Sequence, residues 1–255
     1  MKNISDRKRI VVKVGTSTLT HRTGMLNIRR VEQLVKTLAD IQNSGHEVIL
    51  VSSGAIGLGM GKLGLRERPK DTPGKQACAA VGQCELMYLY DNLFAEYSIT
   101  VAQMLLTKYI LLEDRRKNVE NAMERLIAHG VIPIINENDT VAIDELELEV
   151  GENDSLAATV AAIAKADLLI IMSDIDGLYD KDPHTYDDAR LIPVVHEITD
   201  DIRALAGGAG TKLGTGGMIT KLNAVEIAYD SDIDVVLMNG QHPKTLYDLF
   251  DGKTV

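Results

Sequence analysis

The sequence predicts a three-layer α/β/α sandwich with a mainly parallel central sheet. Two short runs of β-branched and aliphatic residues, 10–14 and 48–51, read as buried strands. Between them, residues 28–43 carry apolar side chains three or four positions apart and end just before Gly45, which predicts a helix. A strand, a helix and a strand in succession are typical of a parallel sheet with right-handed crossovers. Because this alternation continues along the chain, we expect helices on both faces of the sheet.

The remaining predicted elements continue the alternation of strands and helices. Further strands are expected at residues 100–106, 131–135, 167–172 and 235–238. Further helices are expected at residues 74–96, 113–129 and 154–165, and after the glycines at 214–217. The helix over 154–165 is Ala-rich and nearly all apolar, so we expect it to be buried. Residues 145–150 alternate strictly between acidic and apolar side chains and predict a half-exposed strand in a hairpin, with Glu145, Glu147 and Glu149 on its solvated face.

Composition limits the classes of function. The formal net charge of −10 argues against a nucleic-acid partner, which needs a basic face. The polar start of the chain and the lack of a run of about 20 apolar residues predict neither a signal peptide nor a membrane span. Cys78 and Cys84 lie six positions apart in a predicted helix, point in different directions and are not expected to form a disulfide. We therefore expect a cytoplasmic protein with no membrane partner, formed by a single domain over residues 1–255.

The predicted strands end in segments suited to ligand binding. In open α/β sheets ligands bind at the carboxyl ends of the strands. Four strand ends are polar or glycine-containing: Lys-Val-Gly-Thr-Ser at 13–17, Ser-Ser-Gly-Ala at 52–55, Asn-Glu-Asn-Asp at 136–139 and Ser-Asp at 173–174. Asp139 and Asp154 each follow an Asn at the edge of an element, where binding residues gather.

The segment Leu-Gly-Thr-Gly-Gly-Met-Ile-Thr-Lys at 213–221 predicts an anion site. Its glycines allow backbone N–H groups to approach a ligand, and the helix that follows presents the positive end of its dipole. Lys221 adds a positive charge one turn into that helix, and Thr215 and Thr220 add hydroxyl groups. The alternative is a flexible surface loop ahead of an amphipathic helix.

Lys13 is a lysine within an apolar strand. Burial of its charge requires a partner, and the neighbouring Gly15, Thr16 and Ser17 favour a phosphate. The alternative is a lysine at a strand end whose ammonium group reaches water. If both lysines bind phosphate, Lys13 and Lys221 approach one phosphate chain from opposite sides, as phosphoryl transfer requires.

Other motifs give little evidence of a functional site. Residues 59–64 match the pattern GxGxxG, but they start several residues after the strand, and no acidic residue ends a following strand about 20 positions on, so no dinucleotide site is predicted. These glycines instead predict a close approach of two backbone segments. The sequence contains no Walker A loop, no Ser–His–Asp or Cys–His set and no metal-ligand spacing.

Taken together, the strand-end motifs resemble the amino acid kinase family. The resemblance spans nearly the whole chain in order. The motifs that carry it are Val12-Lys-Val-Gly-Thr-Ser17, Ser52-Ser-Gly-Ala55, Ile135-Asn-Glu-Asn-Asp139, Gly151-Glu-Asn-Asp154, Ser173-Asp-x-x-Gly-Leu-Tyr179 and Gly214-Thr-Gly-Gly-Met218. The combination of Ile-Asn-Glu-Asn-Asp with Gly-Thr-Gly-Gly-Met is typical of the members that phosphorylate glutamate. The resemblance therefore implies ATP- and Mg²⁺-dependent phosphorylation of the side-chain carboxylate of L-glutamate to L-glutamyl 5-phosphate, the first step of proline biosynthesis.

The resemblance also implies roles for residues of this sequence. Lys13 and Lys221 would contact the phosphates and stabilise the transition state, and Asp154 would orient both lysines. Ser53, Asp139 and Asn153 would bind glutamate. ATP would be bound by Lys13, Ser173, Asp174, Thr215, Gly216, Gly217, Met218, Ile219, Thr220 and Lys221. The N-terminal part would thus hold glutamate and the C-terminal part ATP, with Mg²⁺ held mainly by the ATP phosphates rather than by protein ligands.

Three further expectations follow from the family. Members are typically inhibited by proline and assemble as dimers or tetramers through this domain. Many also carry a C-terminal PUA domain, of which residues 1–255 contain no counterpart.

Two other functions stay open on the sequence alone. One is a sibling kinase acting on N-acetylglutamate, aspartate, carbamate or UMP. The other is a catalytically inactive sensor that binds glutamate or proline.

Overall fold

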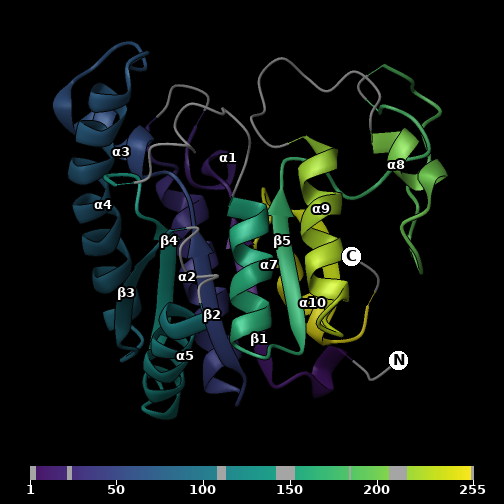
Figure 1. Ribbon diagram of the computed structural model, residues 1–255, viewed down its shortest axis with the longest axis horizontal. Helices are drawn as coiled ribbons and strands as arrows, with labels where there is room; N and C mark the ends of the chain where they lie inside the picture. Colours follow the sequence, from purple (N-terminus) through teal and green to yellow (C-terminus); the bar gives the residue numbers. More distant parts are fainter. Residues whose placement is uncertain are drawn as a thin grey trace.

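A computed structural model describes residues 4–21, 25–107, 113–141, 153–183, 185–206 and 217–253 of the chain. Within these residues one six-stranded sheet forms, with strand order β3-β4-β2-β1-β5-β6 (Figure 1). All its strand pairs are parallel. The strands are β1 Arg9–Val14, β2 Glu47–Ser52, β3 Val101–Leu106, β4 Ile132–Glu137, β5 Leu168–Ser173 and β6 Asp234–Asn239. The predicted parallel sheet is confirmed, and every strand predicted within the described residues is present.

Helices cover both faces of the sheet (Figure 1). One face packs against α2 (Ile28–Asn43), α4 (Thr72–Ala95) and α10 (Thr245–Phe250). The other packs against α5 (Glu113–Ala128), α7 (Asn153–Ile163) and α9 (Met218–Tyr229). The described part of the chain also contains η1 (Ile4–Asp6), α1 (Thr16–Leu19), α3 (Ala55–Leu63) and α8 (Asp200–Ala206). The α/β/α sandwich is therefore confirmed.

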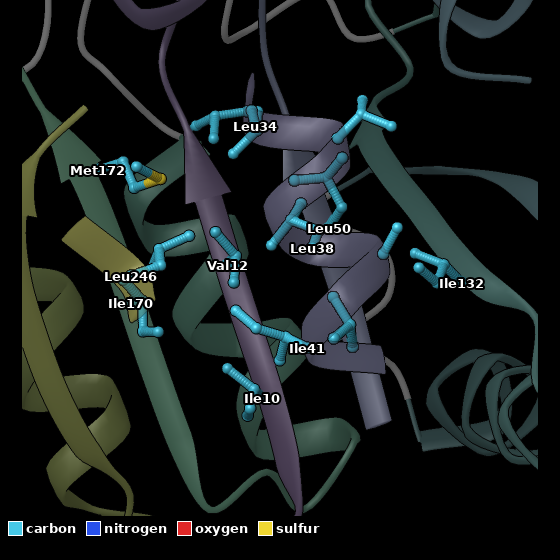
Figure 2. Packing of buried hydrophobic residues seen from close by; sticks show 14 of the residues in the cluster. Ile10, Val12, Leu34, Leu38, Ile41, Leu50, Ile132, Ile170, Met172 and Leu246 are labelled. Carbon is cyan, nitrogen blue, oxygen red and sulfur yellow. The ribbon is translucent and has the colours of Figure 1, made fainter. Parts of the chain in front are cut away.

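Strand alternation divides the core into two clusters. On β1, Ile10, Val12 and Val14 face α2, whereas Val11 lies in the cluster that contains α7. Figure 2 shows Leu34, Leu38 and Ile41 of α2 directed at Ile10 and Val12 of β1. Because successive side chains of a strand point to opposite faces, Lys13 lies on the same face as Val11, towards α7. The apolar pattern of β1 thus determines on which face of the sheet Lys13 lies.

The predicted helix over 28–43 shows how local signals set the element bounds. The side chain of Asn27 accepts a hydrogen bond from the backbone N–H of Arg30, which caps the start of α2. Beyond its end, Gly45 has a φ of +107°, which ordinary residues rarely adopt. Seven α2 residues are buried, among them Leu34 and Leu38. The helix over 154–165 is likewise confirmed as the mostly buried α7.

Helix α3 was not predicted from the sequence, because its glycines are more typical of a loose turn than of a helix. The predicted close approach of two backbones is confirmed: α3 packs directly on α4. A Cβ atom added to Gly82 would lie 1.7 Å from the carbonyl oxygen of Ala55, and one added to Gly59 would lie 1.8 Å from that of Cys78. Gly59 and Gly82 therefore serve the packing of these two helices. The short helices α1, α8, α10 and η1 were also not predicted, since each is too short for a periodic pattern to emerge.

Three smaller expectations have mixed outcomes. Cys78 is buried and Cys84 exposed, and both are free. The strand predicted over 145–150, including its three glutamates, lies outside the described residues. Among the described residues, no helix is both long and apolar enough to span a membrane.

Candidate active site

The carboxyl ends of the strands meet the N-terminal ends of α7 and α9 at one edge of the sheet (Figure 1). This follows from the topology, since a helix between parallel strands runs antiparallel to them. Helices α7 and α9 pack against one another. Asn153 and Asp154 form the start of α7, and Gly217 precedes α9 without a side-chain cap. Two positive helix ends therefore point to the same region, which suits an anionic ligand.

Asp154 holds both lysines that the sequence singled out. Its Oδ1 lies 2.6 Å from Nζ of Lys13, and its Oδ2 lies 3.6 Å from Nζ of Lys221. Lys13 is 9% exposed, Asp154 1% and Lys221 6%. Residues that are more than 60 positions apart in the sequence thus form one buried cluster of two cations and one anion. A buried excess of positive charge is costly unless an anion joins it, so the cluster is prepared for a negatively charged ligand.

Burial lowers the pKa of the Lys221 ammonium group below its ordinary value of 10.5. The nearby Asp154 carboxylate opposes this shift, Lys13 adds to it, and Asp174 opposes it. Lys221 thus loses its proton more readily than a lysine in water. A bound polyanion would favour its charged form.

A chain of polar side chains extends from this cluster along the strand ends. Nδ2 of Asn153 donates to Oγ of Ser53 at 2.5 Å and to Oδ1 of Asn136 at 3.4 Å. Nδ2 of Asn136 in turn donates to Oε1 of Gln83 on α4 at 2.9 Å. Because Asn153 is the chain neighbour of Asp154, these side chains adjoin the lysine cluster.

Ser53 follows β2 and is held by the strands beside it. Its backbone N–H donates to the carbonyl oxygen of Val14 at 3.1 Å. The preceding Ser52 is buried, and its hydroxyl lies 2.9 Å from that of Tyr90 on α4. Gly54, which follows, has a φ of +102° and begins the turn into α3. The end of β2 is therefore fixed on both sides of Ser53.

The other predicted residues fall into three groups. The Thr220 hydroxyl lies 2.8 Å from the carbonyl oxygen of Gly217, its closer acceptor, and 3.4 Å from Oδ2 of Asp154, so it borders the cluster. Ser173 is buried at the end of β5 and donates to the exposed Asp174 at 3.1 Å. Asp139 is half-buried in the turn after β4.

The glycine segment is described only in part. Gly217 precedes α9, and Met218 and Ile219 form its first residues, with Ile219 49% exposed. Thr215 and Gly216 lie outside the described residues. The predicted helix after the glycines is confirmed.

Three residues of the site were not predicted. Asn136 belongs to the recognised strand-end segment, and its position as the last buried residue of β4 could have selected it. Gln83 and Tyr90 lie within α4, far from any strand end in the sequence. Their spacing of seven residues places them on one helix face, but only the packing shows that this face reaches the strand ends.

Buried positive charge at the joint ends of two helices is an arrangement for binding and transferring phosphoryl groups. A sequence profile of the amino acid kinase family matches residues 8–239, and the chain belongs to that family. It is therefore a kinase, with ATP as co-substrate.

Three similar proteins are glutamate 5-kinases. The chain is 51% identical over 257 residues to the glutamate 5-kinase of Clostridium perfringens, with 100% of this chain and 96% of the relative aligned. It is 47% identical to that of Lactococcus lactis subsp. lactis, covering 100% of this chain and 95% of the relative. The glutamate 5-kinase of Caldanaerobacter subterraneus subsp. tengcongensis is 52% identical, with 97% of this chain and 66% of the relative aligned.

Solved structures support the fold at much lower identity. The UMP kinase of Ureaplasma parvum superposes with a TM-score of 0.62 at 15% identity, covering 99% of this chain and 97% of that chain. The isopentenyl phosphate kinase of T. acidophilum superposes with a TM-score of 0.63 at 19% identity, covering 95% of both chains. At these identities the similarity concerns the fold alone.

Proposed function

We propose that the protein phosphorylates the side-chain carboxylate of L-glutamate with ATP, giving L-glutamyl 5-phosphate and ADP in the first step of proline biosynthesis. The observation that carries the proposal is the junction at Asn153 and Asp154. Asp154 gathers two buried lysines, while Asn153 bonds to Ser53 at a second strand end. One pair of neighbouring residues thus joins a phosphate-binding cluster to a polar subsite. The similarity to glutamate 5-kinases supports glutamate as the acceptor.

Each side of this junction receives one substrate. Ser53, Asp139 and Asn153 bind glutamate at the ends of β2, β4 and α7. Ser173, Asp174 and the segment from Thr215 to Lys221 bind ATP beside β5 and α9. Lys13 and Lys221 contact the transferred phosphoryl group, and Asp154 orients both. The N-terminal part of the single domain therefore serves glutamate and the C-terminal part ATP.

The chemistry requires charge neutralisation more than proton transfer. The glutamate carboxylate has an ordinary pKa of about 4.3 and is ionised at neutral pH, so no general base is needed. One of its oxygens attacks the γ-phosphorus of ATP, a new P–O bond forms, and the bond to the oxygen bridging the β- and γ-phosphates breaks. ADP leaves with that electron pair. Lys13 and Lys221 offset the repulsion between the two anions and the charge that develops on the phosphoryl oxygens.

Mg²⁺ fits this site as an ion carried by the nucleotide. The carboxylate at the centre, Asp154, is engaged by two lysines. Mg²⁺ commonly binds through substrate phosphates and water, with few protein ligands. We therefore assign its ligands mainly to ATP, where it neutralises phosphate charge.

Three further properties belong to the same proposal: feedback inhibition by proline, assembly into a homodimer or homotetramer, and a cytoplasmic location. Proline shares with glutamate an α-carboxylate beside an α-amino nitrogen, so it can compete for the groups that bind that end of the substrate. Titration of proline against glutamate measures the inhibition, and sedimentation gives the oligomeric state.

A substrate panel tests the proposed function. ADP release is measured with glutamate, N-acetylglutamate, aspartate, carbamate and UMP, and hydroxylamine trapping identifies an acyl phosphate. Glutamate-dependent ADP release with a trapped hydroxamate is expected. A preference for another acceptor would identify a sibling kinase. Binding of glutamate or proline without ADP formation would identify a sensor and contradict the proposal.

A further inference from the structure

The amide of Gln83 is buried at the glutamate side of the site without taking part in the phosphate cluster. Gln83 is 8% exposed and lies on α4, which contributes no predicted site residue. Its Oε1 accepts the hydrogen bond from Asn136, whereas its Nε2 is buried and has no hydrogen-bond partner within the described residues. An unpaired buried donor costs stability. An apolar side chain of similar size would remove that donor but would leave the NH₂ group of Asn136 without its acceptor, so the hydrogen bond between these two amides is the feature to explain.

The backbone fixes the direction of the hydrogen bonds around Asn136. The backbone N–H of Glu137 donates to Oδ1 of Asn136 at 2.9 Å. A backbone N–H can only donate, so this atom of Asn136 must be the oxygen. The opposite atom is therefore the NH₂ group, and the Gln83 atom facing it must be an acceptor.

The same argument assigns the donor and the acceptor in the hydrogen bond between Asn153 and Ser53. Because Oδ1 of Asn136 accepts, the Asn153 atom directed at it must be the NH₂ group. That NH₂ group also donates to Oγ of Ser53. The Ser53 hydroxyl accepts at its oxygen, which leaves its own hydrogen available. An available O–H donor suits a carboxylate, which can only accept hydrogen bonds when ionised.

We propose that Gln83 is a positioning residue: its oxygen anchors the NH₂ end of the Asn136 amide, whose direction the backbone fixes, and so keeps Asn153 and the Ser53 hydroxyl in place for that hydroxyl to donate to the acceptor substrate. The proposal rests on the proposed function and assigns Gln83 no contact with substrate. Gln83 acts through Asn136 and Asn153. Loss of its oxygen removes the acceptor for the NH₂ group of Asn136, so the Asn136 side chain keeps only its contact with the Glu137 backbone and can shift away from Asn153.

The test is a double-mutant cycle between Gln83→Met and Asn153→Ala. Alone, Gln83→Met is expected to raise the KM for glutamate at least about fivefold, with kcat and the KM for ATP within about twofold. In the Asn153→Ala background, where the chain is already broken, Gln83→Met should add less than about twofold. Asn92→Met, an exposed amide on the same helix, is the matched control and should leave all three constants unchanged.

Stability separates positioning from a purely structural role. Gln83→Met exchanges one unpaired buried donor for another, so the melting temperature should stay within about 2 °C of the wild type. Gln83→Glu keeps an oxygen facing Asn136 and should give a glutamate KM closer to the wild type than Gln83→Met does. If Gln83→Met does not fold, Gln83→Ala takes its place in the cycle.

Two results would overturn the proposal. One is an effect of Gln83→Met on the glutamate KM that is as large in the Asn153→Ala background as in the wild type, which would indicate direct substrate contact. The other is an unchanged glutamate KM in a folded Gln83→Met variant. Failure of the proposed function is seen separately, because wild-type enzyme would then release no ADP with glutamate.

Discussion

Asp154 owes its importance to the two lysines that share it. It is almost fully buried, its Oδ1 lies 2.6 Å from Nζ of Lys13, and its negative charge is the strongest influence that opposes the lowering of the Lys221 pKa by burial. A single carboxylate between two ammonium groups fixes the orientation of both lysine side chains. It also leaves the cluster with a net positive charge. Under the proposed function, an incoming γ-phosphate meets this positive charge in a protein whose overall charge is −10.

Lys221→Ala removes one of the two cations. We expect kcat to fall at least about tenfold, which corresponds to about 1.4 kcal/mol of transition-state stabilisation. Lys62→Ala, which removes an exposed lysine paired with Glu85, is the control and should keep wild-type kcat. Steady-state kinetics on folded protein measures both. A Lys221→Ala variant with near-wild-type kcat would contradict the assigned role.

Asn153→Ala removes the donor to Ser53. We expect the KM for glutamate to rise about tenfold, as for loss of a hydrogen bond that orients a charged ligand, with a much smaller change in the KM for ATP. Initial rates over a grid of both substrates separate the two constants. A raised ATP KM with an unchanged glutamate KM would reverse the assignment of the two subsites.

The pH profile reports the protonation of Lys221. Catalysis needs the charged ammonium, and its pKa in the free enzyme is lowered below 10.5, chiefly by burial. As pH rises through that lowered value, kcat/KM for ATP should fall, so the alkaline limb should begin below pH 10.5. In Lys221→Arg the guanidinium stays charged, and the limb should move to higher pH. An alkaline limb at the same pH in both proteins would assign the titration to another group.

At the scale of elements, the site depends on where helices begin. The start of α7 supplies both Asn153 and Asp154, and the start of α9 supplies Thr220 and Lys221. On the other face, α4 brings Gln83 and Tyr90 against the ends of β4 and β2. The position of α4 is set in part by its close contact with α3.

That contact gives a prediction about stability. Gly82→Ala would place a methyl group 1.7 Å from the carbonyl oxygen of Ala55, so the two helices must separate. We expect the free energy of unfolding to fall by about 2 kcal/mol or more. Gly61→Ala in α3, where a Cβ meets nothing within 4 Å, is the control and should stabilise by about 0.5–1 kcal/mol. Denaturant unfolding measures both. Equal effects of the two substitutions would contradict the packing argument.

At the scale of the whole molecule, the site spans much of the sheet. Its groups come from the ends of β4, β2, β1 and β5 and from three helices on two faces. A ligand that bridges them binds only the folded chain and must therefore stabilise it.

Thermal unfolding tests this coupling. ATP with Mg²⁺ at about 100 times its Kd should stabilise the protein by about 2.7 kcal/mol, or roughly 5–10 °C in Tm. At the same nucleotide concentration, the shift should be smaller in Lys221→Ala, because its affinity for phosphate is reduced. A wild-type Tm that does not respond to saturating ATP would contradict nucleotide binding at this site.

The sequence by itself determined the parallel α/β/α architecture, because apolar periodicity and strand–helix alternation are local and repeat along the chain. It also singled out Lys13, Asp154 and Lys221 as candidate ligand-binding residues, since such residues gather at strand and helix ends, and the family resemblance added Ser53 and Asn153. Only the tertiary structure decided which of them touch. That Asp154 joins two lysines, and that Gln83 of α4 reaches Asn136 of β4, depends on packing between segments far apart in sequence. A helix interior gives no local sign of the element it will face, and for that reason Gln83 and Tyr90 emerged only from the fold.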